Sequence, residues 1–108
     1  MADSLLDSIR RKIGEGNYWF TLHASERMIE RDIAVAEVVE ALLSKTAEII
    51  EDYPNAPRGS SCLVLGKTAR GRSLHVHSSY PPGVAIITSY QPEPNDWVNE
   101  RTRRGEKR

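Results

Sequence analysis

Apolar residues follow a helical repeat in the first part of the chain. Within residues 1–16 they recur every three or four positions, the spacing that places side chains on one face of an α-helix. Ser4 and Gly14 lie where a start signal and a stop signal of this helix are expected. The apolar face of the predicted N-terminal helix consists of Leu5, Leu6, Ile9 and Ile13.

Residues 20–45 form a second region with helical spacing. Thr21 is suited to cap a helix over about residues 22–31, because its hydroxyl can accept a hydrogen bond from a free backbone N–H. A third helix should follow, whose apolar stripe is formed by Val35, Val38, Val39, Leu42 and Leu43. The aromatic residues 18–20, just before this region, predict a short strand.

From residue 46 the repeat changes from helical to alternating, as expected for strands of a sheet. The predicted strands cover residues 46–53, 61–67, 73–80 and 84–90. Short connections join the last three of these strands, so they should be antiparallel neighbours. After the sheet, Trp97 is expected to fold back onto the core through a short helix.

Helices first and strands afterwards predict one α+β domain over residues 1–100, with the N-terminal helices packed on a roughly four-stranded antiparallel sheet. A length of 108 residues suits a single domain with one modest core. The sheet should occupy residues 46–90. Residues 101–108 contain no apolar side chain, so we expect a flexible basic tail there.

Composition narrows the class of protein. No run of apolar residues exceeds four, which is far too short to span a membrane. The first eight residues, MADSLLDS, carry acids where a secretory signal needs cations. Cys62 is the single cysteine and cannot form an internal disulfide, which suits a reducing compartment. We therefore expect a cytoplasmic protein that has no membrane partner.

The formal net charge is zero, but the charges are unevenly distributed. Residues 1–52 carry eleven acids against six lysine and arginine residues, whereas residues 53–92 carry four cations and no acid. The four cations are Arg58, Lys67, Arg70 and Arg72. A local basic face that binds phosphate is one interpretation, with Lys67, Arg70 and Arg72 as its candidate residues. An ordinary solvated surface is the other.

The second predicted helix carries three cationic or titratable residues at spacings of four, namely His23, Arg27 and Arg31. Residues four apart on a helix lie on the same side, so the three form one row. The row begins with a histidine, which suits half of an active site. The alternative is a solvated face, on which Glu26 and Glu30 pair with the arginines.

Two histidines lie in the third predicted strand, whose alternation places His75 and His77 on the face opposite Leu74 and Val76. Such a pair can bind a metal only with further ligands, and His23 is the sole remaining histidine. We therefore expect no metal site. The alternative to a chemical role is a half-exposed pair on the outer face of the sheet.

The last predicted strand ends in TSYQP, in which Thr88 and Tyr90 share a face. Together with HxxxRxxxR at 23–31, IIEDYP at 49–54, LVLG at 63–66 and LHV at 74–76, this segment resembles an uncharacterised bacterial family of small proteins. That family is often grouped with the RelE-like and BrnT-like toxin fold, and the resemblance covers roughly residues 18–98.

The resemblance implies a RelE-like fold with helices on a four-stranded antiparallel sheet. It also implies a set of functional polar positions, which fall on His23, Arg27, Arg31, His75, Thr88 and Tyr90. His77 occupies a position where the family is expected to be apolar, so no role is assigned to it.

By the same resemblance, the expected activity is metal-independent RNA cleavage by a toxin-type endoribonuclease without a cofactor. His75 would act as acid or base, with His23 or Tyr90 as its counterpart. Arg27 would bind the phosphate and Arg31 the neighbouring phosphate, while the hydroxyl of Thr88 would orient the substrate. The partners would be RNA and a cognate antitoxin.

Two other classes of function remain open. A non-catalytic binding module would use the same residues for a partner protein or a small anion, and the neutral net charge favours it. An accessory protein without a pocket is the third possibility. Both a monomer and a homodimer are compatible with the sequence.

Overall fold

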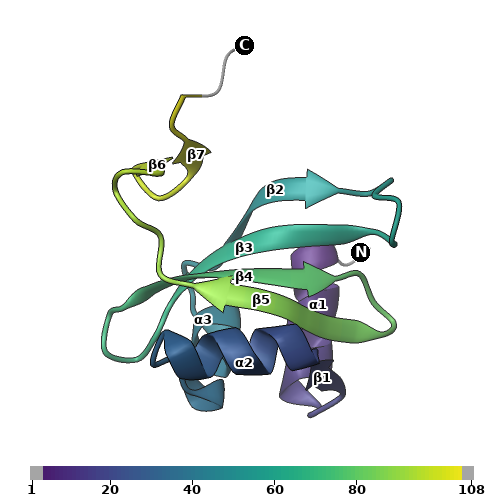
Figure 1. The fold of residues 1–108 in the computed structure, drawn as a ribbon. Coiled ribbons are helices and arrows are strands. Elements are labelled where there is room, and N and C mark those ends of the chain that lie inside the picture. Colours follow the sequence, from purple (N-terminus) through teal and green to yellow (C-terminus); the bar gives the residue numbers. More distant parts are fainter. Residues whose placement is uncertain (1–3, 106–108) are drawn as a thin grey trace.

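Apart from one short strand between the first two helices, the chain folds as helices first and strands afterwards, as the change of repeat predicts (Figure 1). A computed structural model describes residues 4–105 of the chain. In this part the helices are α1 (Leu5–Gly14), α2 (Leu22–Glu30) and α3 (Val35–Leu43). The main sheet contains β1 (Tyr18–Phe20), β2 (Glu48–Tyr53), β3 (Ser61–Lys67), β4 (Ser73–Ser79) and β5 (Val84–Tyr90).

Side-chain caps start the first two helices. The Ser4 hydroxyl accepts a hydrogen bond from the backbone N–H of Asp7 at 3.0 Å, and the Thr21 hydroxyl accepts one from Ala24 at 3.0 Å. Each bond satisfies a backbone donor that has no partner within the helix. The predicted starts of both helices are therefore confirmed.

The main sheet has five strands in the order β1-β5-β4-β3-β2. The prediction of a four-stranded antiparallel sheet is wrong in count and in direction, because β1 joins as a fifth strand and runs parallel to β5. Tyr18 pairs with Val84 and Phe20 with Ile86. A three-residue strand is too short to show an alternating pattern, so neither its pairing nor its direction could be predicted. The remaining neighbours are antiparallel, as expected.

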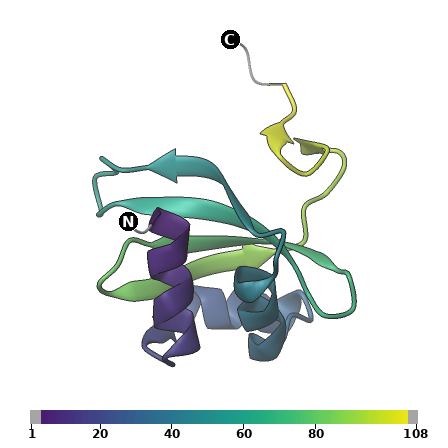
Figure 2. The ribbon, with the colours of Figure 1, turned by 180° about the vertical axis from the view of Figure 1, so that it is seen from behind.

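All three helices cover one face of the sheet (Figures 1 and 2). The core lies between these two layers, and its buried residues alternate along the strands. The helices and strands contribute Ile9, Ile13, Ala24, Met28, Val38, Leu42, Cys62, Val64, Leu74, Val76, Val84 and Ile86. The prediction of an α+β domain with helices packed on a sheet is confirmed.

The C-terminal segment forms a small hairpin on the other face of the sheet. It consists of β6 (Trp97–Val98) and β7 (Thr102–Arg103), paired antiparallel. The expected short helix at Trp97 is therefore wrong. Part of the expected tail, residues 101–108, is β7, and residues 106–108 lie outside the described residues. Within the described part of the chain, no helix is long and apolar enough to cross a membrane.

Candidate functional site

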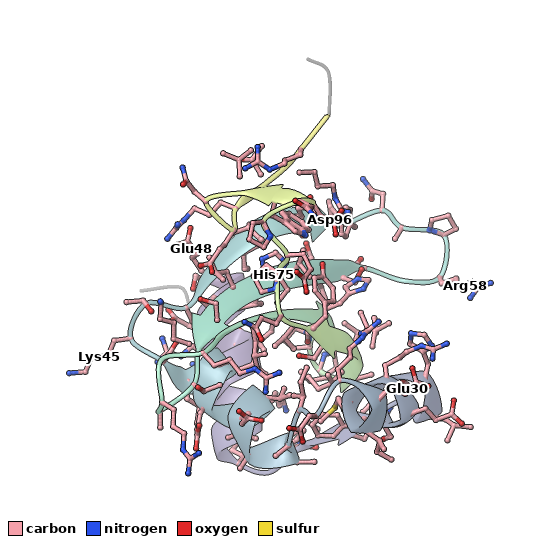
Figure 3. All side chains as sticks on the ribbon, turned by 60° about the vertical axis from the view of Figure 1, so that its left-hand side comes forward. Glu30, Lys45, Glu48, Arg58, His75 and Asp96 are labelled. Atoms are coloured by element: carbon pink, nitrogen blue, oxygen red, sulfur yellow. The ribbon has the colours of Figure 1, made fainter. Side chains whose placement is uncertain are left out.

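His75 lies on the face of the sheet opposite the helices, between β4 and the C-terminal hairpin (Figure 3). Its side chain is fully buried, with 0% exposure. The Nδ1 atom lies 3.3 Å from the hydroxyl of Tyr90, which is the residue opposite His75 on β5. The Nε2 atom lies 2.6 Å from the backbone carbonyl oxygen of Glu100. Both ring nitrogens are therefore engaged.

These two contacts define the proton positions on His75. A carbonyl oxygen can only accept, so Nε2 must carry a proton and donate it to Glu100. Burial lowers the pKa of His75 and favours its neutral form, in which Nδ1 is an acceptor. Burial also raises the pKa of Tyr90, so its hydroxyl stays protonated and donates to His75. The Tyr90 oxygen can still accept a further hydrogen bond.

Arg31 brings a cation from the helical layer to the end of β5, beside Tyr90. It follows the last residue of α2, and its Nη1 donates to the carbonyl oxygen of Ser89 at 2.9 Å and to the hydroxyl of Thr88 at 3.4 Å. Its guanidinium carbon lies 5.8 Å from the centre of the Tyr90 ring. Pairing of β1 with β5 ends at Ile86, which leaves this part of the β5 edge open to Arg31.

The C-terminal hairpin covers His75. The Trp97 ring meets the His75 ring edge-on, with 4.4 Å between the ring centres and an angle of 89° between the planes. The guanidinium of Arg103 lies over the Trp97 ring, 4.7 Å from its centre. Its Nε also donates to the Glu51 carboxylate on β2 at 2.9 Å. Sequence reasoning missed Glu51, Glu100 and Arg103 as members of the site.

A depression of about 640 Å³ opens between the outer face of the sheet and the hairpin. Its sheet side is formed by Tyr53, Leu63, His77, Thr88 and Tyr90, and its hairpin side by Asn95, Asp96, Trp97, Arg103, Arg104 and Gly105. A neighbouring depression of about 430 Å³ contains Arg31 and Arg72, and shares Tyr90, Asp96 and Trp97 with the first. Tyr90 therefore lines both depressions.

The segment from residue 20 to residue 91 matches the family described as a domain of unknown function, DUF4258. The chain belongs to this family. A search of curated proteins found no match, and neither did a search of solved structures. The DUF4258 segment includes Arg31, His75, Thr88 and Tyr90, whereas the hairpin that covers His75 follows it in the chain.

His77 is the histidine of this DUF4258 domain that faces the larger depression. Its Nε2 lies 2.9 Å from the hydroxyl of Ser61, and its ring centre lies 6.0 Å from that of Tyr53. Among the described residues, Nδ1 of His77 has no hydrogen-bond partner. Burial lowers the pKa of His77. Sequence reasoning assigned it no role, because an apolar residue was expected at this position.

His23 and Arg27 lie apart from His75 in the DUF4258 domain. His23 is exposed on the first turn of α2 and has no hydrogen bond or ion pair with any described residue. Arg27 pairs with Glu30 at 2.8 Å on the same helix. Because α2 covers the face opposite His75, only the last member of the predicted row, Arg31, reaches the sheet residues.

The predicted basic face of residues 53–92 is divided. Lys67 and Arg70 are exposed, and Arg70 lines a separate depression of about 570 Å³ beside α3. Arg72 binds the Glu37 carboxylate at 3.3 Å and the carbonyl oxygen of Asp32 at 2.9 Å. It is the member of this group that lies beside Arg31. In the described part of the DUF4258 protein, no three His, Cys, Asp or Glu residues are grouped to hold a metal.

Proposed function

We propose that this DUF4258 protein is a metal-independent endoribonuclease whose site is the larger depression. The observation that carries the proposal is the hydrogen bond between the Tyr90 hydroxyl and Nδ1 of the buried His75. It joins a group that lines the depression to a neutral imidazole that can take its proton. A phenol with such a partner can remove a proton from a ribose 2′-hydroxyl.

The proposed reaction uses no group outside the protein and the RNA. The 2′-hydroxyl passes its proton to the Tyr90 oxygen while the Tyr90 proton moves to Nδ1 of His75. The 2′-oxygen then bonds to the phosphorus, and the bond from phosphorus to the 5′-oxygen breaks. His77 then gives a proton from the unpartnered Nδ1 to the leaving 5′-oxygen, a step that requires its protonated form; because burial lowers the pKa of His77, this form is a minority near neutral pH and grows as the solution becomes acidic. The products are a 2′,3′-cyclic phosphate and a 5′-hydroxyl.

Arg31 is the proposed phosphate ligand. A guanidinium has five N–H donors, and the hydrogen bonds of Arg31 to Ser89 and Thr88 both come from Nη1. The remaining donors are available to phosphate oxygens, and their charge would stabilise the negative charge of the transition state. Thr88, which accepts from Arg31, would keep the guanidinium in place.

The proposal also includes a biological role, that of a toxin in a toxin–antitoxin system. Helices followed by an antiparallel meander support a grouping with RelE-like toxins, although this is an argument from fold alone. A toxin of this kind would act on RNA in the cytoplasm and would be held inactive by a cognate antitoxin. Growth arrest on expression, relieved by Tyr90→Phe, is the outcome that this role requires.

Cleavage of a synthetic single-stranded RNA in the presence of EDTA tests the activity. Tyr90→Phe removes the hydroxyl and keeps the ring, and we expect cleavage to fall by about 10²-fold or more. Tyr18→Phe is the matched control, because Tyr18 packs against the core and does not line the depression. Equal cleavage by the wild type and Tyr90→Phe would overturn the proposal, as would a complete loss of activity in EDTA.

A non-catalytic RNA-binding module is the second candidate. It is favoured by the internal pairing of the charged groups at the site, since Arg103 already binds Glu51 and Arg72 already binds Glu37. Tyrosine rings and arginines around a hollow on a sheet suit unpaired bases and their phosphates. In this case Tyr90→Phe should bind RNA as the wild type does, and neither protein should cleave it.

A further inference from the structure

The hairpin β6–β7 contacts His75 on two sides, although it lies beyond the segment that matches the family. The Glu100 carbonyl oxygen accepts from Nε2 at 2.6 Å, and the Trp97 ring packs against the imidazole. Trp97 is itself buried, with 4% of its surface exposed. The hairpin therefore determines both the burial of His75 and the partner of one of its nitrogens.

Glu100 adopts a backbone conformation that needs external support. Its φ is 67° and that of Asn99 is 52°, and few side chains other than asparagine or aspartate adopt this left-handed region without strain. Two contacts hold Glu100 against β4: its carboxylate accepts from the Ser73 hydroxyl at 3.0 Å, and its carbonyl accepts from His75. These two contacts therefore hold the turn of the hairpin against β4.

Two ion pairs tie the hairpin to β2, the strand at the sheet edge. Arg101 binds Glu48 through Nη2 at 2.8 Å, and Arg103 binds Glu51 through Nε at 2.9 Å. Arg103 also lies over Trp97. Because these arginines are about half exposed, each pair alone contributes little, but they act on the same short element.

We infer that the C-terminal hairpin is a positioning segment, whose docking onto β2 and β4 fixes the orientation and the tautomer of His75. With the hairpin docked, Nε2 carries the proton and Nδ1 is held toward the Tyr90 hydroxyl. With the hairpin undocked, Nε2 loses its acceptor and the ring loses the cover of Trp97, so that Tyr90 alone no longer fixes the tautomer and the ring is free to rotate. Glu100, through its carbonyl, and Trp97, through its ring, are then positioning residues. The consequence for cleavage rests on the proposed function, whereas the docking does not.

The experiment uses the full chain carrying Trp19→Phe, so that Trp97 is the single tryptophan. Arg101→Glu with Arg103→Glu reverses the hairpin side of both ion pairs. Adding Glu48→Arg and Glu51→Arg restores both pairs with the charges exchanged. Lys45→Glu with Arg58→Glu is the matched control, because it makes the same change of charge at two exposed residues away from the hairpin (Figure 3).

Two measurements need no RNA: acrylamide quenching of Trp97 fluorescence, and the ¹⁵N NMR signals of the His75 ring. We expect the double reversal to raise quenching severalfold and to give His75 the averaged signals of two exchanging tautomers. The matched control should give wild-type values, and the exchanged pairs should bring both signals back toward them, although the contact of Arg103 with Trp97 is not restored. Continued protection of Trp97 in the double reversal, or a single Nε2–H tautomer after Trp97 becomes exposed, would overturn the inference.

Cleavage is measured on the same four proteins. If the wild type cleaves RNA, the double reversal should lose activity and the exchanged pairs should recover it. An exposed Trp97 together with wild-type cleavage would overturn the positioning role. If no protein cleaves RNA while quenching and NMR behave as expected, the ribonuclease proposal fails and the docking inference stands. The two failures are therefore distinguishable.

Discussion

The guanidinium of Arg31 lies over the ring of Tyr90, 5.8 Å from its centre, although Arg31 comes from the helical layer and the Tyr90 side chain lies on the opposite face of the sheet. Arg31 follows a helix that packs on the core face, and Tyr90 projects from the outer face. The contact is possible because the end of β5 has no neighbouring strand on the side of β1, and Arg31 fills that edge with a hydrogen bond to Ser89.

Replacing Arg31 should therefore cost stability. Arg31→Ala removes a charged hydrogen bond to a backbone carbonyl and a cation–π contact, so we expect the free energy of unfolding to fall by about 1–2 kcal/mol. Arg27→Ala on the same helix removes only an exposed pair with Glu30, for which we expect a loss below about 0.5 kcal/mol. Urea denaturation of both variants measures the difference, and equal losses would contradict the assigned role of Arg31.

Stability should fall as the solution becomes acidic. Burial lowers the pKa of both His75 and His77 below the value of an unfolded histidine; Glu51 and Glu100 oppose the shift at His75, and Arg103 adds to it. Between the folded and unfolded pKa values the unfolded chain binds more protons, so the stabilisation is complete above the unfolded pKa of about 6.5 and is lost progressively below it.

Denaturation between about pH 7.5 and pH 5 measures this dependence, because the window spans the ordinary histidine pKa. We expect His75→Asn to show a smaller decrease in the free energy of unfolding than the wild type over this range, since one of the two shifted histidines is absent. Its stability at the upper pH will also be lower, because the hydrogen bonds to Tyr90 and Glu100 are lost. An unchanged decrease would show that His75 does not contribute.

Local patterns predicted much of the fold and part of the site. The alternation in LHVH correctly placed His75 on the face opposite Leu74, and the same rule correctly placed Thr88 and Tyr90 on one face of β5. The hydroxyl caps at Ser4 and Thr21 were also correct. These features depend on residues within a few positions of one another, which is the range over which sequence patterns carry information.

The remaining parts depend on contacts between distant segments. The row of His23, Arg27 and Arg31 suggested one shared site, but the row lies on a helix of the core face, and only its end reaches the outer face. Nothing in a polar C-terminal segment indicated that Arg103 would pair with Glu51, since that pairing depends on how the hairpin docks.

Gly66 should tolerate no side chain. A Cβ atom at this position would lie 2.0 Å from the carbonyl oxygen of Ala41, in a place where α3 packs directly on β3. The nearest atoms are backbone atoms of Ala41, which cannot move aside as a flexible side chain could. We therefore expect Gly66→Ala to destabilise the protein by about 3 kcal/mol or more. Gly14→Ala is the matched control, because no atom lies within 4 Å of its Cβ and its φ is ordinary.

Thermal denaturation of the two glycine variants provides the measurement. Alanine restricts the unfolded chain more than glycine does, so Gly14→Ala should leave stability unchanged or raise it by up to about 1 kcal/mol. If Gly66→Ala were as stable as Gly14→Ala, the close packing of α3 on β3 would be disproved.

The thiol of Cys62 should react only when the protein opens. Its side chain is fully buried in the core, and burial raises the pKa of the thiol to about 12, so almost no thiolate is present near neutral pH. We expect a thiol-specific reagent such as DTNB to leave the folded protein unmodified on the time scale in which it labels the urea-unfolded chain.

Slow labelling of the native protein should then follow the equilibrium population of open molecules. Arg31→Ala should label faster, by about tenfold for each 1.4 kcal/mol of lost stability, if the chain opens globally. Rapid labelling of the wild type, at a rate independent of stability, would place Cys62 at an accessible surface and contradict the core described above.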